Sequence, residues 1–265
     1  MRPTVTLLTD YGPGTEHVGA LHAVIAAGCP DADRIDLAHN IPPGDVIWGT
    51  LLFEQLVDIS TIGTHLAVVD PGVGTSRRSI AIQCTDGRSL VGPDNGILMR
   101  AADLFGVAGA VALETPPGSS ATFHGRDIFA PVCARLAAGA DLATLGVPIE
   151  LSSLVRVTWP PTIAAPGRIE TTVVGADQFG NLTLSAGPDA PQAAVLRLGD
   201  AIVVDAPSGR LDAHLGRTFG DVRPGATLVY IDAHGLLAIA INGGNAKQQL
   251  SAKPTETIIL TLRDR

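Results

Sequence analysis

The pattern of apolar residues changes once along the chain, and this change constrains the fold more than any other feature. Up to about residue 158, short apolar runs alternate with amphipathic stretches long enough for helices; beyond residue 166, short apolar runs are separated only by turn residues. The first pattern predicts an α/β domain with a mostly parallel sheet flanked by helices, and the second predicts a small all-β barrel or sandwich. The intervening segment 159–166, WPPTIAAP, is rich in proline and predicts a linker.

We therefore expect an α/β domain over residues 1–158 and a β-barrel domain over 167–265. In the first domain we predict strands at 4–8, 34–37, 66–69, 79–83, 88–91 and 108–113, the fourth and fifth forming a hairpin, and helices at 16–27, 45–59, 95–102 and 128–138. In the second we predict strands at 168–174, 181–184, 194–198, 201–204, 227–231, 236–241 and 257–262.

Composition narrows the class of protein. The chain of 265 residues is 46% hydrophobic and 17% charged, and no apolar stretch reaches the roughly 18 residues of a membrane span. A net charge of −8 without a basic run argues against nucleic-acid and membrane partners. Cys29, Cys84 and Cys133 are widely spaced, and the N-terminus lacks a signal-peptide pattern, so we expect a cytoplasmic protein with reduced thiols.

The segment HLAVVDPGVGTSRR (65–78) carries the sharpest chemical signal. An apolar run ends in Asp70, a glycine turn follows, and Arg77 comes seven residues after the acid. In open α/β sheets the carboxyl ends of strands are where ligands bind, so Asp70 is a candidate for a reaction site. A structural Asp–Arg pair that closes a loop is the alternative.

Two further clusters in the first domain hold polar groups in turns. LLTDYG places Asp10 at the end of the first strand, where a carboxylate can bind a ribose diol or simply bond its own turn. TFHGRD places His124 at a helix start, where it can move a proton near neutral pH or belong to a capping cluster. In VGPDNG we favour a loop in which Asp94 or Asn95 caps the next helix.

In the second domain, DQFGN (177–181) sets an acid, an aromatic ring and an amide around a glycine. These groups could bind an ammonium, stack on a base and read its edge; a plain β-turn is the alternative. The chain has no H-x-x-x-H metal spacing, no phosphate-binding glycine motif and no G-x-S-x-G elbow. Asp10, Asp70 and His124 around a divalent ion therefore remain a minor alternative.

Six motifs taken in order resemble a known family. LLTDYG, VVDPGVGTSRR, LVGPDNGIL, TFHGRDIFAP, DQFGNLTLS and HGLLAIAINGGNA cover residues 5 to about 246 and are similar to those of the adenosine-forming S-adenosyl-L-methionine (SAM) hydrolases. This family is also called SAM hydroxide adenosyltransferase and is related to the fluorinases and chlorinases. The resemblance implies an N-terminal α/β domain, a C-terminal barrel, and a homotrimer with active sites at subunit interfaces.

The resemblance also implies the reaction, in which water or hydroxide attacks ribose C5′ of SAM and releases adenosine and L-methionine. It assigns the catalytic triad to Asp70, Arg77 and His124, with Arg78 as the fallback arginine, and implies neither a metal nor a cofactor. The implied substrate-binding residues are Asp10, Tyr11, Phe123, Gly125, Asp177, Phe179, Asn181, Ala233, His234, Asn242 and Gly243.

Comparison within the superfamily favours hydrolysis. Halogenases that resemble this chain place a tyrosine where Asp70 stands, and Gly125 occupies the place of the fluorinase halide serine. The chain departs from the expected Asn-Ser pair at Asp232-Ala233-His234, which concerns the methionine carboxylate contacts. The alternatives are a non-catalytic adenosine- or SAM-binding protein, a chlorinase-like SAM-dependent halogenase, and a metal-dependent nucleotide hydrolase.

Overall fold

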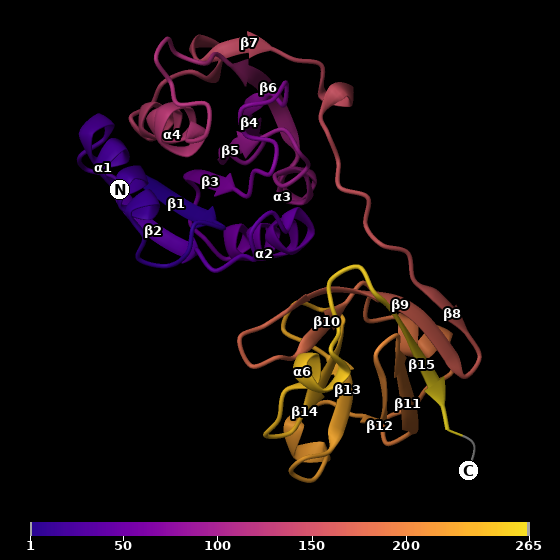
Figure 1. The fold of residues 1–265 in the computed structure, drawn as a ribbon. Helices are drawn as coiled ribbons and strands as arrows, with labels where there is room; N and C mark the ends of the chain where they lie inside the picture. The colour runs from indigo at the N-terminus through magenta and orange to yellow at the C-terminus, as the bar shows by residue number, and fades with distance from the viewer. Residues whose placement is uncertain (1, 264–265) are drawn as a thin grey trace. The chain divides into compact units, whose positions relative to one another are not determined.

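The fold divides into two compact units whose boundary lies between Val157 and Thr158 (Figure 1). It is a computed structural model that describes residues 2–263. The segment 159–166, predicted as a linker, contains a short strand, β8 (Ile163–Ala165), which pairs with β9 (Arg168–Ala176) of the second unit.

The first unit is built on a seven-stranded mixed sheet with the strand order β2-β1-β3-β5-β4-β6-β7. The strands are β1 (Thr4–Thr9), β2 (Asp33–Ala38), β3 (Thr64–Val68), β4 (Ser79–Cys84), β5 (Ser89–Pro93), β6 (Val107–Leu113) and β7 (Gly146–Pro148). The pairings β2–β1, β1–β3 and β3–β5 are parallel, and those of β4 with β5 and β6 and of β6 with β7 are antiparallel. The predicted α/β class and the β4–β5 hairpin are confirmed.

Helices cover both faces of this sheet (Figure 1). Helices α1 (Glu16–Gly28) and α4 (Ala130–Ala137) lie on one face, and α2 (Val46–Asp58) and α3 (Met99–Phe105) on the other. The α1/α4 face buries a continuous apolar core because each helix presents a stripe of apolar side chains to the strands. Short 3₁₀ turns at Leu142–Thr144 and Leu151–Ser153 complete the unit.

Helix α3 begins later than the sequence predicts. The predicted helix over 95–102 with an Asp94 or Asn95 cap is wrong, since α3 begins at Met99. Asn95 instead accepts from the amide of Ile97 and donates to the carbonyl of Val69, which holds residues 95–98 in a turn. Asp94 accepts from Arg78 Nε and from the amide of Val155, so neither residue caps α3.

The second unit is a closed barrel of seven strands in the cyclic order β10-β14-β13-β12-β11-β15-β9, and β8 extends it beside β9. The barrel strands not yet given are β10 (Leu182–Leu184), β11 (Ala201–Ala206), β12 (Gly209–Leu215), β13 (Thr227–Ile231), β14 (Leu237–Ile241) and β15 (Thr257–Leu262). Apolar side chains that alternate along these strands fill the interior of the barrel. The same alternation in the sequence predicted the all-β domain.

Two details of the barrel differ from the sequence prediction. The predicted strand over 194–198 is wrong, because helix α5 (Ala190–Ala193) is followed by a turn in which the Leu196 amide donates to the carbonyl of Pro191. Strand β12 was not predicted, since GRLDAHL alternates charged and apolar residues without a continuous apolar run. Short elements α6 (Ala246–Leu250) and the 3₁₀ turn Phe219–Asp221 lie between strands.

Within residues 2–263 no helix combines the length and the apolar character needed to cross a bilayer. The three cysteines are buried and are not joined in disulfides.

Candidate active site

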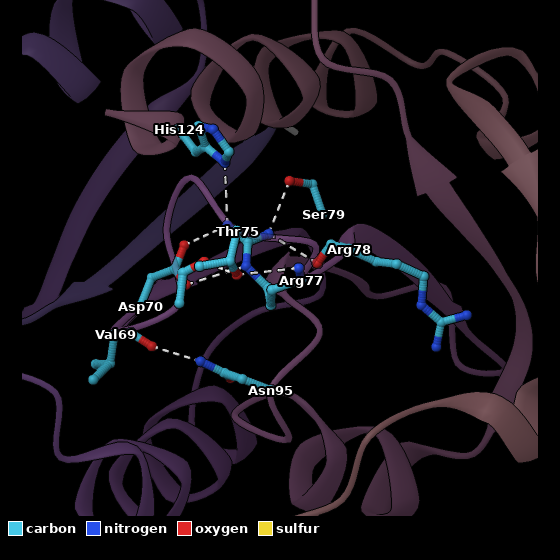
Figure 2. A network of polar contacts seen from close by, with 9 residues as sticks. Val69, Asp70, Thr75, Arg77, Arg78, Ser79, Asn95 and His124 are labelled. Atoms are coloured by element: carbon cyan, nitrogen blue, oxygen red, sulfur yellow. Dashed lines mark hydrogen bonds and ion pairs between the residues drawn. The ribbon is translucent and has the colours of Figure 1, made fainter. Parts of the chain in front are cut away.

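Asp70 lies at the carboxyl edge of the central parallel strands, where the sequence predicted it. It follows β3, which pairs with β1 on one side and β5 on the other. Asp10 follows β1 at the same edge, and its backbone amide donates to the carbonyl of Val68. The loop after β5 also lies at this edge, because the side-chain amide of Asn95 donates to the carbonyl of Val69, the residue before Asp70 (Figure 2). Three loops therefore meet where ligands bind in such sheets.

Arg77 grips the Asp70 carboxylate with two parallel hydrogen bonds (Figure 2). Its Nε donates to Oδ1 at 3.1 Å and its Nη2 to Oδ2 at 2.5 Å. The remaining nitrogen, Nη1, donates to the carbonyl of Arg78 and to the Ser79 hydroxyl. The Asp70 and Arg77 side chains are only 5% and 8% exposed. A bidentate pair at this burial fixes the carboxylate rigidly.

The glycine turn between these two residues allows the close return. The Thr75 amide donates to the carbonyl of Gly72, and Gly74 has a φ of 76°. A Cβ atom at residue 74 would lie 2.6 Å from the carbonyl oxygen of Ala121, so the turn can pack against the segment leading to His124 only as glycine. Gly74 thus has a steric cause, whereas a Cβ atom at Gly72 would make only ordinary contacts of 3.5 Å or more.

His124 completes the cluster through the same guanidinium. Arg77 Nη2 lies 3.1 Å from His124 Nδ1. Because a guanidinium only donates, Nδ1 must be the unprotonated nitrogen, and His124 is the neutral Nε2–H tautomer. Burial and then the Arg77 charge lower the pKa of His124, which favours the same neutral form. The triad that was inferred from the resemblance is thus brought together in space.

The Asp70 carboxyl is more basic than an ordinary aspartate. Burial raises its pKa above the usual 3.8, and the favourable charge and hydrogen bonds of Arg77 offset only part of that effect. A carboxylate that is buried, ionised and held by one cation is well suited to accept a proton from a bound water.

His124 is positioned by a π-helical turn, η1 (Gly125–Phe129), that leads directly into α4. The amide of Ala130 donates to the carbonyl of Gly125 across this wider turn. Such turns are rare and often lie at functional sites. The sequence predicted a helix only from residue 128, because a histidine followed by glycine carries no π-helical signal.

Arg78, the fallback arginine, belongs to a different network. Its Nε donates to Asp94 at 2.8 Å, and its Nη atoms bond Ser153. In Figure 2 its side chain points away from Asp70. Arg77, and not Arg78, is therefore the arginine that contacts Asp70 in this structure.

The loop that carries Asp10 is held by residues that the sequence did not single out. Asp10 Oδ2 accepts from the amide of Gly44 at 2.9 Å, and partial burial raises its pKa. Beneath it, the Thr9 hydroxyl bonds His39 Nδ1 at 2.8 Å and accepts from the amide of Tyr11. His39 Nε2 in turn faces the Asp36 carboxylate at 3.0 Å. The only sequence signal for this support was a histidine three residues after an acid.

An aromatic cluster lies beside the triad. The ring of Phe123 packs edge-on against Tyr11 and tilted against His17, and Arg126 lies 4.9 Å above its centre. Gly125 lies against the Tyr11 hydroxyl. The predicted substrate-binding residues of the first unit therefore all lie around the carboxyl edge of β1 and the start of η1.

The second unit contains a cavity of about 620 Å³ that gathers most of its predicted binding residues. Of the residues predicted from the sequence, it is lined by Asp177, Phe179, Asn181, Ala233, His234 and Gly243. Phe179 is 67% exposed at this cavity. Asn242 is not among the lining residues, because its side chain donates to the carbonyls of Phe219 and Val222.

The two carboxylates at this cavity accept most of their hydrogen bonds from their own turns. The Asp177 carboxylate accepts from the amides of Phe179 and Asn181 and from the Asn181 side chain. The Asp232 carboxylate likewise accepts from the amides of His234 and Leu236, and from the Thr183 hydroxyl. The β-turn alternative for DQFGN is therefore correct as local structure, and it presents Phe179 to the cavity.

Comparison with known proteins assigns the family. The model of the SAM hydroxide adenosyltransferase N-terminal domain matches residues 5–146, and that of the C-terminal domain matches residues 171–259.

The chain belongs to the SAM hydroxide adenosyltransferase family.

Relatives in this family match over almost the full length. Proteins named (R)-S-adenosyl-L-methionine hydrolase from Salinispora arenicola and Salinispora tropica are 42% and 44% identical to it, each over 98% of both chains. A crystal structure of an uncharacterized conserved protein from Thermotoga maritima is 33% identical, with a TM-score of 0.86, and the match covers 97% of this chain and 99% of that one. A fluorinase from Actinopolyspora mzabensis is a more distant relative at 26% identity. The predicted resemblance is thus confirmed.

Within residues 2–263 no group of three or more His, Cys, Asp and Glu side chains is arranged to hold a metal ion. Asp10, Asp70 and His124 lie at one edge of the sheet without forming such a group, and each oxygen of Asp70 accepts one hydrogen bond from Arg77.

Proposed function

We propose that this protein hydrolyses S-adenosyl-L-methionine, the (R) sulfonium epimer in particular, to adenosine and L-methionine. The buried cluster of Asp70, Arg77 and His124 carries the proposal, because it provides a fixed carboxylate at the ligand-binding edge of the sheet. Full-length relatives named (R)-S-adenosyl-L-methionine hydrolase support both the reaction and the epimer.

The reaction suits these groups chemically. Water attacks C5′, the new C–O bond forms as the C5′–S bond breaks, and the electron pair stays on the neutral thioether of methionine. A sulfonium leaves without protonation, so orientation and desolvation of the water are the main tasks of the protein. Asp70 would hold that water, and the Arg77 charge would stabilise the hydroxide that develops.

The hydrogen-bond pattern supports Asp70 as the proton acceptor. His124 Nδ1 faces an obligate donor, and Nε2 already carries the proton, so neither nitrogen is free to accept one. Asp70 is ionised, buried and more basic than usual. We infer that His124 orients Arg77 and can donate a hydrogen bond through Nε2–H, whereas Asp70 takes the proton from the water.

The remaining predicted residues fall into two groups by the part of the substrate they would bind. In the first unit, Asp10 would bind the ribose hydroxyls, and Phe123 with Tyr11 and Gly125 would pack against the substrate. In the second, the cavity residues would bind adenine and methionine: Phe179 by stacking, Asn181 at the adenine edge, and Asp177 with the backbone of Ala233, His234 and Gly243 at the polar ends. The backbone of Asn242, next to Gly243, would contribute from outside the cavity lining. The exposed ring of Phe179 is consistent with stacking on a base.

We further propose a homotrimer in which the active site lies between the N-terminal domain of one subunit and the C-terminal domain of its neighbour. The first unit holds the reactive groups and the second an aromatic cavity, so a substrate with an adenine, a ribose and an amino acid needs both kinds of surface. We propose a cytoplasmic location, where SAM is available, and a reaction that needs no metal or cofactor.

The test is incubation with (R)- and (S)-SAM in ¹⁸O-water, followed by mass spectrometry of the nucleoside. The expected product is adenosine labelled at the 5′ oxygen, formed without added metal and in the presence of EDTA. Unlabelled adenosine would exclude attack of water on C5′. A chloride-containing buffer included in the same series would reveal 5′-chloro-5′-deoxyadenosine if the protein were a halogenase, and binding of SAM without any product would make it a binding protein.

A further inference from the structure

Tyr11 and Gly125 are fitted to each other beside the triad. A Cβ atom at residue 125 would lie 2.3 Å from the Tyr11 hydroxyl oxygen, and 3.2 and 3.3 Å from the ring atoms Cζ and Cε2. Real Cβ atoms do not approach other atoms so closely, so only glycine at position 125 leaves the phenol where it is. Gly125 does not have a positive φ, so the contact with Tyr11, and not the backbone conformation, explains why residue 125 is a glycine.

The phenol is held in place by its ring. Phe123 packs edge-on against it with 5.9 Å between ring centres, and His17 packs at 5.6 Å. The Tyr11 backbone amide donates to Thr9, which His39 supports from below. A tyrosine with this many constraints presents its hydroxyl in one direction.

The hydroxyl itself is not used by the protein. Within residues 2–263 the Tyr11 hydroxyl forms no hydrogen bond. The one hydrogen bond between Tyr11 and a side chain is donated by its backbone amide to the Thr9 hydroxyl. The Tyr11 oxygen is also accessible to solvent, because it is not one of the fully buried polar atoms that lack a hydrogen-bond partner. Burial of the ring and the charges of Asp10 and Asp70 raise the pKa of Tyr11, so the phenol stays neutral throughout the physiological range. A constrained neutral hydroxyl without a partner, adjacent to the residue that follows His124, points to an external ligand.

We propose that the Tyr11 hydroxyl binds the attacking water together with Asp70, and that Gly125 is the residue that makes room for it. The inference rests on the proposed function. A water molecule has two protons: Asp70 accepts one and the Tyr11 oxygen accepts the other, which leaves a lone pair directed at C5′. During the reaction Asp70 takes one proton, Tyr11 keeps its own, and the second proton stays on the oxygen that becomes the 5′-hydroxyl.

The first test is Tyr11→Phe, which removes one oxygen atom and keeps the ring. We expect kcat to fall about 10- to 100-fold, the range of a lost orienting hydrogen bond, with KM for SAM and Kd for adenosine within about twofold. The acid limb of the pH–rate profile should not move, because Tyr11 gives up no proton. A kcat within twofold of the wild type, or equal losses of kcat and adenosine affinity, would overturn the inference.

The second test links the two residues. Gly125→Ala should lower kcat to a similar extent in the wild type, because its Cβ displaces the hydroxyl, but should have little further effect in Tyr11→Phe. The matched control is Gly19→Ala in α1, where an added Cβ meets no atom within 4 Å, and it should leave kcat unchanged. Equal effects of Gly125→Ala in both backgrounds would contradict the coupling.

The two proposals fail in different ways. Absence of turnover by the wild type in either SAM epimer overturns the proposed function and this inference with it. Turnover by the wild type together with an unimpaired Tyr11→Phe variant overturns only the inference. Thermal unfolding of each variant separates loss of turnover from loss of fold.

Discussion

In the first unit the charged side chains Asp70 and Arg77 are buried and bonded to each other, whereas in the second unit the carboxylates at the cavity accept mainly from amides of their own turns. Asp70 and Arg77 are 5% and 8% exposed and come from the two ends of a glycine turn. Asp177 is saturated by amides within four residues of itself, and Phe179 beside it is 67% exposed.

This difference teaches how the two surfaces would divide the work. A buried, bidentate ion pair costs stability to assemble and is rigid, which suits groups that must be placed accurately for a reaction. An exposed ring on a stiff turn costs little and gains area when a base stacks on it. We therefore expect substitutions of Asp70, Arg77 and His124 to change kcat and those at the cavity of the second unit to change KM.

Asp70→Asn should have the largest effect. The amide keeps the shape of the side chain but loses the negative charge that accepts the proton, so we expect kcat to fall about 10³-fold, within the range of lost general-base catalysis. Adenosine affinity, measured by calorimetry, should change little. A proportional loss of affinity would make Asp70 a binding residue and would remove the contrast between the units.

The next largest effect is on stability, and it should arise in the first unit. Burial, with a smaller contribution from the Arg88 charge, lowers the pKa of His65 to about 4, from 6.5 when unfolded. Between pH 6.5 and pH 4, His65 binds a proton in the unfolded chain but not in the folded protein. The free energy of unfolding should therefore decrease as pH falls over this range, by up to about 3 kcal/mol.

Denaturant titrations at pH 7 and pH 4.5 measure this loss. His65→Gln can still bond the Thr6 hydroxyl that now bonds His65 Nδ1, but does not titrate in this window. The variant should lose markedly less stability on acidification than the wild type. An identical pH dependence in the two proteins would assign the acid sensitivity to other groups.

Phe179→Ala should affect binding alone. Loss of stacking on a base corresponds to about 1–3 kcal/mol, so KM for SAM should rise by about tenfold or more while kcat stays within about twofold. Steady-state kinetics over a wide range of SAM concentrations measures both. A fall in kcat as large as that of Asp70→Asn would show that the cavity does more than bind.

At neutral pH the rate should show the smallest effect of all, and it should decrease only on acidification. Asp70 works ionised and His124 works neutral, so kcat/KM should decrease as pH falls, by about tenfold per unit once a group protonates. Because the pKa of His124 is lowered from 6.5 and that of Asp70 is raised from 3.8, the rate should be constant at neutrality and fall only below the ordinary histidine value. A limb near pH 7 would require a different titrating group.

Much of the architecture could be predicted from the sequence because it depends on local patterns. Alternating strand and helix signals predicted the α/β unit, and alternating apolar residues predicted most barrel strands. The errors occur where tertiary contacts override local preference: Asn95 bonds Val69 instead of capping a helix, and β12 is a strand because its neighbours β11 and β13 pair with it.

The candidate site was predictable only as a set of residues. The spacing from Asp70 to Arg77 and the order of six motifs lie in the sequence, and so does glycine at position 125. The tautomer of His124, the choice of Arg77 over Arg78 and the fit of Gly125 to Tyr11 do not, because each depends on atoms from loops that are distant in the chain.

The sequence by itself determined the family, the two-part architecture and the residues available for chemistry, since these follow from motif order and short-range periodicity. Only the tertiary structure decided how those residues are used. It brought the end of β3, the glycine turn and the start of η1 together, and at these distances hydrogen bonds assign donors, acceptors and protonation states. In the sequence Asp70 is an acid at a strand end. In the structure it is a buried carboxylate paired with Arg77, which suits the proposed role of accepting a proton from water.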